Sequence, residues 1–140
     1  MKTLRFLSAL SLLFCMVLTA NAQEDTDQNT SQDEQIDKTE VYYFHLTRRC
    51  TTCKTVEAEA KKAVEELYPE EIKNGQVSFS SINIEESGNE EIIEKLGVTG
   101  QSLLIVKNGN QEDITNTGFM YATTKPGKLK KKIAETIENL

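Results

Sequence analysis

Two cysteines separated by two threonines, Cys50-Thr51-Thr52-Cys53, are the residues of this chain best suited to chemistry. They follow an apolar, strand-like run over 41–46 and open a helical stretch. A Cys-x-x-Cys pair where a strand gives way to a helix is typical of a dithiol or disulfide site. The first sulfur lies near unpaired backbone N–H groups and the positive end of the helix dipole, which both favour a thiolate. The spacing therefore predicts redox chemistry at these two sulfurs.

Three cations flank the cysteines: Arg48 and Arg49 precede Cys50, and Lys54 follows Cys53. A free cysteine has a pKa of about 8.5, so only a few per cent of it is ionised at neutral pH. Positive charges nearby lower the pKa of a thiol because they stabilise its anion. We therefore expect Cys50 to be appreciably ionised at pH 7.

Two other interpretations of the cysteine pair stay open. A disulfide here could be a structural staple, although closing a four-residue loop stabilises a fold by only about 2 kcal/mol in the chain-entropy description. Alternatively, Cys50 and Cys53 could bind a metal, with His45, the single histidine, as third ligand. No fourth ligand is apparent, so our first expectation is a site without metal.

Residues 1–22 have the features of a secretory signal peptide. Lys2 and Arg5 supply positive charge, 6–18 is mostly apolar, and 19–22 ends in an Ala-x-Ala cleavage pattern. The alternative is a membrane anchor, but about 15 helical residues span roughly 22 Å of a hydrocarbon core about 30 Å thick. Cleavage near Gln23 would remove Cys15 and leave no stable membrane anchor. The sequence thus predicts an exported protein, periplasmic or extracellular, in an oxidising compartment where a disulfide persists.

Residues 23–40 hold seven acidic residues, one lysine and almost no apolar side chain. This composition buries too little surface to offset the entropy of ordering, which predicts an acidic disordered linker. The segment 41–140 is long enough for one compact domain, which we expect to be a monomer. It holds 13 basic and 15 acidic residues. A near-neutral domain gives no argument for binding nucleic acid.

Hydrophobic periodicity and turn residues predict the elements of this domain. Apolar residues recur at helical spacing over 53–68, and Asn108-Gly109 is a strong hairpin signal. The expected elements are a strand at 41–46, a helix at 53–68, a strand at 77–84, a helix at 90–96, strands at 103–106 and 111–117, and a last helix from Pro126. This order predicts an α/β fold in which a mixed central sheet carries helices on both faces.

Three stretches in this order resemble the thioredoxin-like family over nearly all of 41–140. The stretch 43–54, with its Cys-x-x-Cys, resembles the active-site strand and helix start of that family. The segments 82–86 and 94–98 resemble its second strand and following helix, and 103–109 resembles its central strand and hairpin. The resemblance implies a three-layer α/β/α fold with a mixed central sheet.

Carried over by position, the resemblance makes Cys50 the attacking sulfur and Cys53 the resolving one. The chain departs from the family at three positions. Arg49 stands where a Trp is usual, Phe44 stands where the family has a buried acid, and Gln101 stands at or near the place of a cis-proline. That proline shapes the substrate groove and shields the sulfurs from metal ions, so its absence keeps the metal interpretation open.

From the residues and the resemblance together we expect an exported thiol–disulfide oxidoreductase. Cys50 and Cys53 are its catalytic residues, and Arg48, Arg49, Lys54 and Gln101 support them. The resemblance implies that no bound cofactor is needed. The partners would be a protein or small-molecule thiol or disulfide and a dithiol that donates electrons. A metal or metalloid carrier and a redox-inert interaction domain are the alternatives.

Overall fold

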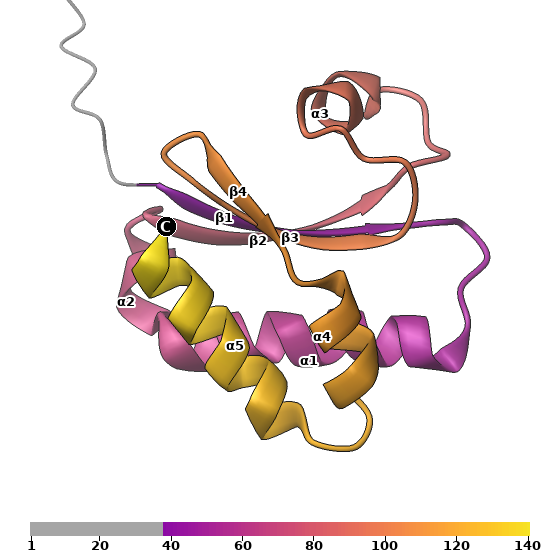
Figure 1. Cartoon of the computed structure of the whole chain (residues 1–140). Helices are drawn as coiled ribbons and strands as arrows, with labels where there is room; N and C mark the ends of the chain where they lie inside the picture. Colours follow the sequence, from indigo (N-terminus) through magenta and orange to yellow (C-terminus); the bar gives the residue numbers. More distant parts are fainter. Residues whose placement is uncertain (1–37) are drawn as a thin grey trace, which may run out of the picture. The chain divides into compact units, whose positions relative to one another are not determined.

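The computed structural model describes residues 38–140, so the signal-peptide interpretation and most of the predicted linker lie outside the described part. The part of the chain between 38 and 140 combines strands and helices, and most of them lie where the hydrophobic pattern predicts (Figure 1). The elements in chain order are β1 Thr39–His45, α1 Thr51–Leu67, α2 Pro69–Lys73, β2 Val77–Asn83, α3 Glu90–Lys95, β3 Ser102–Lys107, β4 Asn110–Asp113, α4 Thr115–Tyr121 and α5 Pro126–Asn139.

The strands form one mixed sheet in the order β2-β1-β3-β4. β1 and β2 run parallel, with Thr39 opposite Val77. β3 runs antiparallel to β1, with Val41 opposite Ile105, and β4 returns antiparallel to β3. A parallel pair needs a crossover connection, which α1 and α2 supply, whereas β3 and β4 need only the short turn at 108–109. The mixed α/β fold predicted from the sequence is confirmed.

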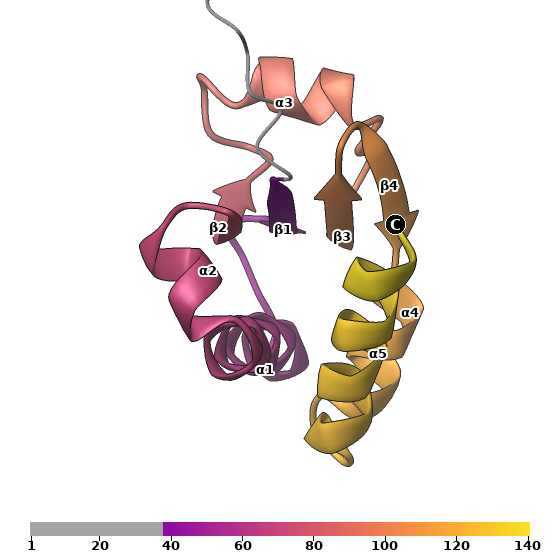
Figure 2. The ribbon, with the colours of Figure 1, turned by 90° about the vertical axis from the view of Figure 1, so that its left-hand side faces the viewer.

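Helices cover both faces of the sheet, so the domain has three layers (Figure 2). α3 lies on one face, and α1, α4 and α5 lie on the other. The two central strands are therefore buried on both sides, which explains their continuous apolar runs. Along β1, Val41 and Tyr43 face α1 while Tyr42 and Phe44 face the α3 layer, because successive side chains of a strand alternate.

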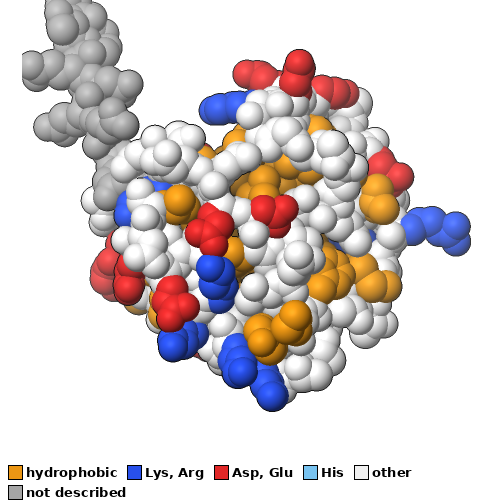
Figure 3. Space-filling view, viewed as in Figure 1, with side chains coloured by type: hydrophobic (Ala, Val, Ile, Leu, Met, Phe, Trp, Pro, Cys, Tyr) orange, Lys and Arg blue, Asp and Glu red, His pale blue; other side chains and the backbone are white. Residues whose placement is uncertain are grey.

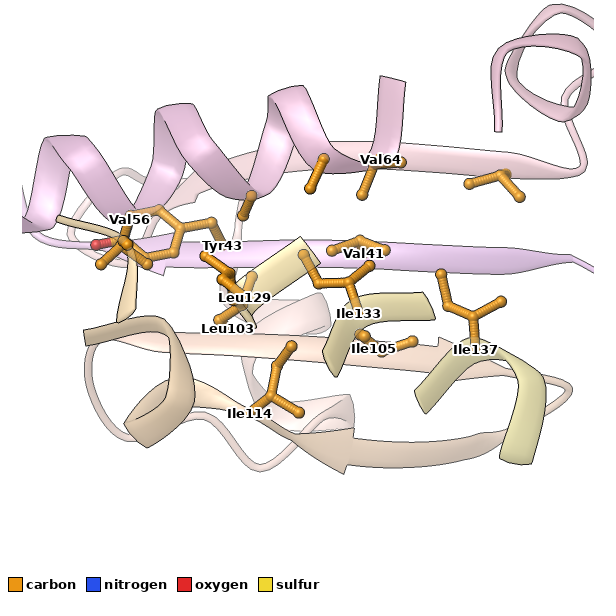
Figure 4. Packing of buried hydrophobic residues seen from close by; sticks show 14 residues of the cluster. Val41, Tyr43, Val56, Val64, Leu103, Ile105, Ile114, Leu129, Ile133 and Ile137 are labelled. Carbon is orange, nitrogen blue, oxygen red and sulfur yellow. The ribbon is translucent and has the colours of Figure 1, made fainter. Parts of the chain in front are cut away.

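The larger core lies between the sheet and the layer of α1, α4 and α5 (Figure 4). α1 contributes a stripe that includes Val56, Ala60 and Val64, and α5 contributes Leu129, Ile133 and Ile137. These positions recur at three- and four-residue steps, so each stripe stays on one side of its helix. The core thereby fixes α1, the helix that opens with the Cys-x-x-Cys pair, against Val41 and Tyr43 of β1.

One predicted strand is present but shorter than the sequence indicated. The sequence suggested a strand over 111–117, but β4 ends at Asp113 and helix α4 follows. The Asp113 carboxylate accepts a hydrogen bond from the backbone N–H of Thr115 at 2.8 Å, which turns the chain out of the sheet. Ile114 is then buried in the main core, and Gly118 lets α4 approach Val56 closely. Packing, not strand propensity, decides this segment.

Two boundaries also differ from the sequence prediction. Thr39 is buried and its N–H donates to the carbonyl oxygen of Gln76 at 2.8 Å, so β1 takes in the last two residues of the predicted linker. The short helix α2 was not predicted. Its start at Pro69, with Glu70 and Glu71 in the first turn and Lys73 in the last, suits the helix dipole.

Acidic and basic side chains are interspersed on the face shown in Figure 3. Two lysines of α5 form ion pairs with acidic residues of other elements. Lys130 Nζ lies 2.9 Å from a carboxylate oxygen of Glu66 in α1, and Lys132 Nζ lies 2.6 Å from one of Glu112 in β4. Within 38–140, no helix is both long enough and apolar enough to cross a bilayer.

Candidate redox site

The two cysteines occupy the first turn of α1, where the chain leaves the end of β1 and turns back under the sheet (Figure 1). They form a disulfide, with their Cα atoms 5.2 Å apart. Cys50 is the N-cap of α1, and its Sγ accepts a hydrogen bond from the backbone N–H of Cys53 at 3.2 Å. Cys50 is exposed, whereas Cys53 is only 5 % exposed. One sulfur is therefore open to a partner and the other is shielded.

The loop before the cysteines is held by the last residue of β2 and by a residue just after that strand. The N–H of Thr47 donates to a carboxylate oxygen of Glu85 at 2.8 Å, and the Asn83 side-chain amide donates to Thr47 Oγ1 at 3.0 Å. The hydrogen bond from Thr47 lowers the pKa of the Glu85 carboxyl group. Sequence reasoning missed these residues. Polar side chains at the carboxyl ends of two adjacent parallel strands were the available signal, because such ends meet at one edge of the sheet.

A buried tyrosine lies beneath Cys53. Tyr43 is fully buried and points toward α1 (Figure 4), where its hydroxyl group donates to the carbonyl oxygen of Cys53 at 2.9 Å. Burial raises the pKa of this phenol, the Glu57 carboxylate raises it further, and Arg49 acts in the opposite direction. Tyr43 therefore stays protonated and acts as a hydrogen-bond donor in the neutral range.

Phe44, at the position where the resemblance places a buried acid, faces away from the cysteines. Its ring is fully buried in the cluster under α3, with Tyr42 and Leu104. The side of β1 that faces Cys53 presents Tyr43 instead. Within the described domain, the polar group beneath Cys53 is thus a neutral phenol rather than a carboxyl group.

The three predicted cations differ in their surroundings. Arg49 forms an ion pair with Glu57, a residue one turn beyond Cys53 on α1, and both side chains are 23 % exposed. Arg48 and Lys54 are exposed and form no salt bridge with any residue of the described part. Only these two remain unpaired beside the disulfide. Sequence reasoning did not place Glu57 beside the cysteines, although its i,i+4 spacing from Cys53 puts it on the same side of the helix.

Gln101 does lie at the cysteines, 48 positions along the chain from Cys53. Its Oε1 atom is 3.7 Å from Cys53 Sγ. In the disulfide the sulfur has no proton to share, whereas a reduced Cys53 thiol could donate one to this oxygen. The peptide bond that precedes Gln101 is trans, like every other between 38 and 140. Gln101 therefore covers the buried sulfur with a polar, flexible side chain.

His45 is nearly buried at the end of β1, on the same side of the strand as Tyr43. Its Nδ1 atom lies 3.0 Å from the carbonyl oxygen of Leu46, an acceptor, so this contact is a hydrogen bond when Nδ1 carries the hydrogen. In the part of the chain that the structure describes, no three His, Cys, Asp or Glu side chains come together as a metal site. The alternative of a Cys50, Cys53 and His45 metal centre therefore has no support from the geometry.

No protein-family model matches the chain. No curated protein matches it either. One solved structure similar to it is described as "Structure of a malarial protein"; it is 16% identical, the match covers 64% of this chain and 97% of that one, and the TM-score is 0.41. That likeness says nothing about activity. The chain's own geometry, a Cys50–Cys53 disulfide in a mixed α/β domain, is compatible with a thioredoxin-like protein.

Proposed function

We propose that this protein is a thiol–disulfide oxidoreductase in which Cys50 exchanges covalent partners and Cys53 resolves the mixed disulfide. The observation that carries the proposal is the asymmetry of the pair. Cys50 is exposed at the start of α1, and Cys53, linked to it, is 5 % exposed one turn into the helix. An accessible sulfur with a shielded partner beside it suits reversible exchange.

The reaction needs two exchange steps, written here for reduction of a substrate disulfide. The Cys50 thiolate attacks one substrate sulfur, a Cys50–substrate disulfide forms, and the other substrate sulfur leaves as a thiolate that takes up a proton. Cys53 then loses its proton to solvent and attacks Cys50 Sγ. The Cys50–Cys53 disulfide forms, and the second substrate thiolate leaves. A partner dithiol then reduces the Cys50–Cys53 disulfide through two further exchanges; the partner becomes a disulfide, and Cys50 and Cys53 return to thiols.

Several features favour the thiolate form of Cys50. Its Sγ receives the backbone N–H of Cys53, and this hydrogen bond becomes stronger when the sulfur is an anion. The positive end of the α1 dipole lies at the same point. The first turn, Thr51-Thr52-Cys53-Lys54, contains no acid, and Arg48 and Lys54 are exposed cations on either side. All these effects lower the pKa of a thiol.

A purely structural disulfide is the competing interpretation. The pair closes a loop of only four residues inside one helical turn, which limits its stabilisation to about 2 kcal/mol in the chain-entropy description. Cys53 already accepts the Tyr43 hydrogen bond at its carbonyl oxygen and is a buried residue of α1, as Val56 is. The disulfide thus joins residues that the fold has already brought together.

Trapping a mixed disulfide tests the proposal directly. In Cys53→Ser the resolving sulfur is absent, so Cys50 should accumulate a covalent adduct with a disulfide substrate such as insulin, detected by mass spectrometry. Cys50→Ser is the matched control and should form far less adduct, because Cys53 is shielded. The wild type should reduce insulin catalytically with a dithiol donor, and both variants should not. A wild type that forms no adduct and has no turnover would identify a redox-inert domain.

Export is part of the same proposal. The positive residues Lys2 and Arg5, the apolar run 6–18 and the Ala-x-Ala pattern before Gln23 support removal of a signal peptide. An oxidising compartment outside the cytoplasm would preserve the Cys50–Cys53 disulfide between turnovers. Expression in a bacterial host with recovery from the periplasm should give a protein whose first residue is Gln23. Protein found only inside the cells and still beginning with Met1 would contradict export.

A further inference from the structure

Arg49 directly precedes Cys50 in the chain, yet its charged group is bound elsewhere. The guanidinium contacts the Glu57 carboxylate, one helical turn beyond Cys53. The ion pair therefore connects the loop before the disulfide to the second turn of α1. The cation closest in sequence to the exposed sulfur is held by an acid on the helix.

This ion pair is partly shielded from solvent. Each of its side chains is 23 % exposed, and both charges act on the buried phenol of Tyr43, which donates to the Cys53 carbonyl. Water and salt screen such a pair less than one on the open surface. A change in either partner should therefore alter the electrostatic potential at the sulfurs.

We propose that Glu57 is a positioning residue that restrains Arg49 and thereby sets the acidity of Cys50. This inference rests on the proposed role of Cys50 as the exchanging sulfur. In the reduced protein, Arg49 can bind one of two anions, the Glu57 carboxylate or the Cys50 thiolate. Because Glu57 holds the guanidinium, the thiolate depends on the helix terminus, Arg48 and Lys54. If Glu57 did not hold it, the Arg49 guanidinium would stabilise the Cys50 thiolate. Glu57 therefore makes Cys50 less acidic and makes the disulfide harder to reduce.

Few other groups near the cysteines can titrate. β1 contributes Tyr43 and His45, α1 contributes Lys54, and Arg48 lies in the connecting loop. Glu85, which follows β2, accepts a hydrogen bond from Thr47 in the same loop. Gln101, which lies against Cys53, is uncharged. Arg49 and Glu57 are therefore the oppositely charged pair through which the site can be adjusted.

The pH dependence of Cys50 alkylation tests the inference. The reduced protein is treated with iodoacetamide over a range of pH, and the modified Cys50 peptide is quantified by mass spectrometry. In Glu57→Gln the freed guanidinium should lower the pKa of Cys50 by about one unit, a tenfold increase in the ratio of thiolate to thiol. Stabilising the thiolate should also shift the equilibrium with glutathione toward the dithiol form. Glu59→Gln removes the same charge from α1 but not the partner of Arg49, so the pKa of Cys50 and the equilibrium with glutathione should stay unchanged. Glu57→Asp keeps a carboxylate at this position, so its pKa for Cys50 should lie close to that of the wild type.

A second substitution separates a positioning role from a direct charge effect. In an Arg49→Gln background, adding Glu57→Gln should not change the pKa of Cys50, because no guanidinium remains to be released. An equal decrease with and without Arg49 would overturn the inference, as would no decrease in Glu57→Gln itself. Arg49→Gln alone should change the pKa little, which gives a test even if Glu57→Gln folds poorly. Thiol acidity is measured without turnover, so a shifted pKa in a protein that forms no mixed disulfide would refute the proposed function and leave the coupling intact.

Discussion

The hydroxyl group of Tyr43 donates a hydrogen bond to the carbonyl oxygen of Cys53, with 2.9 Å between the oxygen atoms. This contact ties the centre of β1 to the first turn of α1 at the resolving cysteine. Because Tyr43 is fully buried, its position fixes how deep Cys53 lies. Cys53, to which we assign the resolving role, is thus held by the strand beneath it.

Tyr43→Phe should destabilise the domain by about 0.5–1.5 kcal/mol. The ring still fills its place in the core, so only the hydrogen bond to the Cys53 carbonyl is lost. Urea denaturation of the oxidised protein measures the change. Tyr121→Phe, a partly exposed tyrosine on α4, is the control and should stay within about 0.5 kcal/mol of the wild type. Equal stability of Tyr43→Phe and wild type would show that the bond contributes nothing.

Glu85 should make the domain less stable in acid. Its pKa is lowered in the folded state, chiefly by the N–H of Thr47, so its stabilising effect is present above the pKa of the unfolded chain. That effect is lost as the pH falls through the lower, folded pKa. Glu85→Gln should therefore flatten the acid limb of a plot of unfolding free energy against pH. Glu86→Gln, one residue further along the same loop, should leave the limb as it is.

Gln101→Ala should expose the resolving sulfur. The Gln101 side chain lies 3.7 Å from Cys53 Sγ, and Cys53 is only 5 % exposed. In the reduced variant, alkylation of Cys53 should become several-fold faster while that of Cys50 changes little, as measured on the separate cysteine peptides. Gln111→Ala, which shortens a glutamine of β4, is the control. If the Cys53 rate did not change, another group would have to shield this sulfur.

Gly118→Val should destabilise the domain by about 1–3 kcal/mol through overpacking. A Cβ atom at this position would lie 3.1 Å from Val56 Cγ1 and 3.3 Å from Leu103 Cδ2, and both of those side chains are fully buried. Thermal and urea unfolding measure the loss. Gly127→Ala in the first turn of α5 meets no atom within 4 Å, and it should be neutral or slightly stabilising.

The order of elements and the position of the cysteines could be predicted because both depend on patterns between residues close together in the sequence. Hydrophobic periodicity reports which side of each element is buried, and the alternation of apolar and polar residues needs no knowledge of distant partners. β1, α1, β2, α3, β3 and α5 were found this way to within two residues at most ends. The sulfurs were placed correctly at the start of α1 because a Cys-x-x-Cys pair after an apolar run is a local signal.

α4 was missed because Ile114 and the threonines around it favour a strand, whereas burial of Ile114 and the close approach permitted by Gly118 favour a helix. Such contacts join residues far apart in the chain, so no local pattern reports them.

By itself, the sequence determined that two cysteines open a helix beneath a mixed sheet. The tertiary structure decided what surrounds them: Tyr43 rather than Phe44 beneath Cys53, Glu57 as the partner of Arg49, and Gln101 over the buried sulfur. The reason is that the face on which a strand residue lies depends on how the strand pairs and packs. A shift of one residue in the pairing moves every side chain to the opposite face. Spacing along the chain alone does not show which residues face the cysteines.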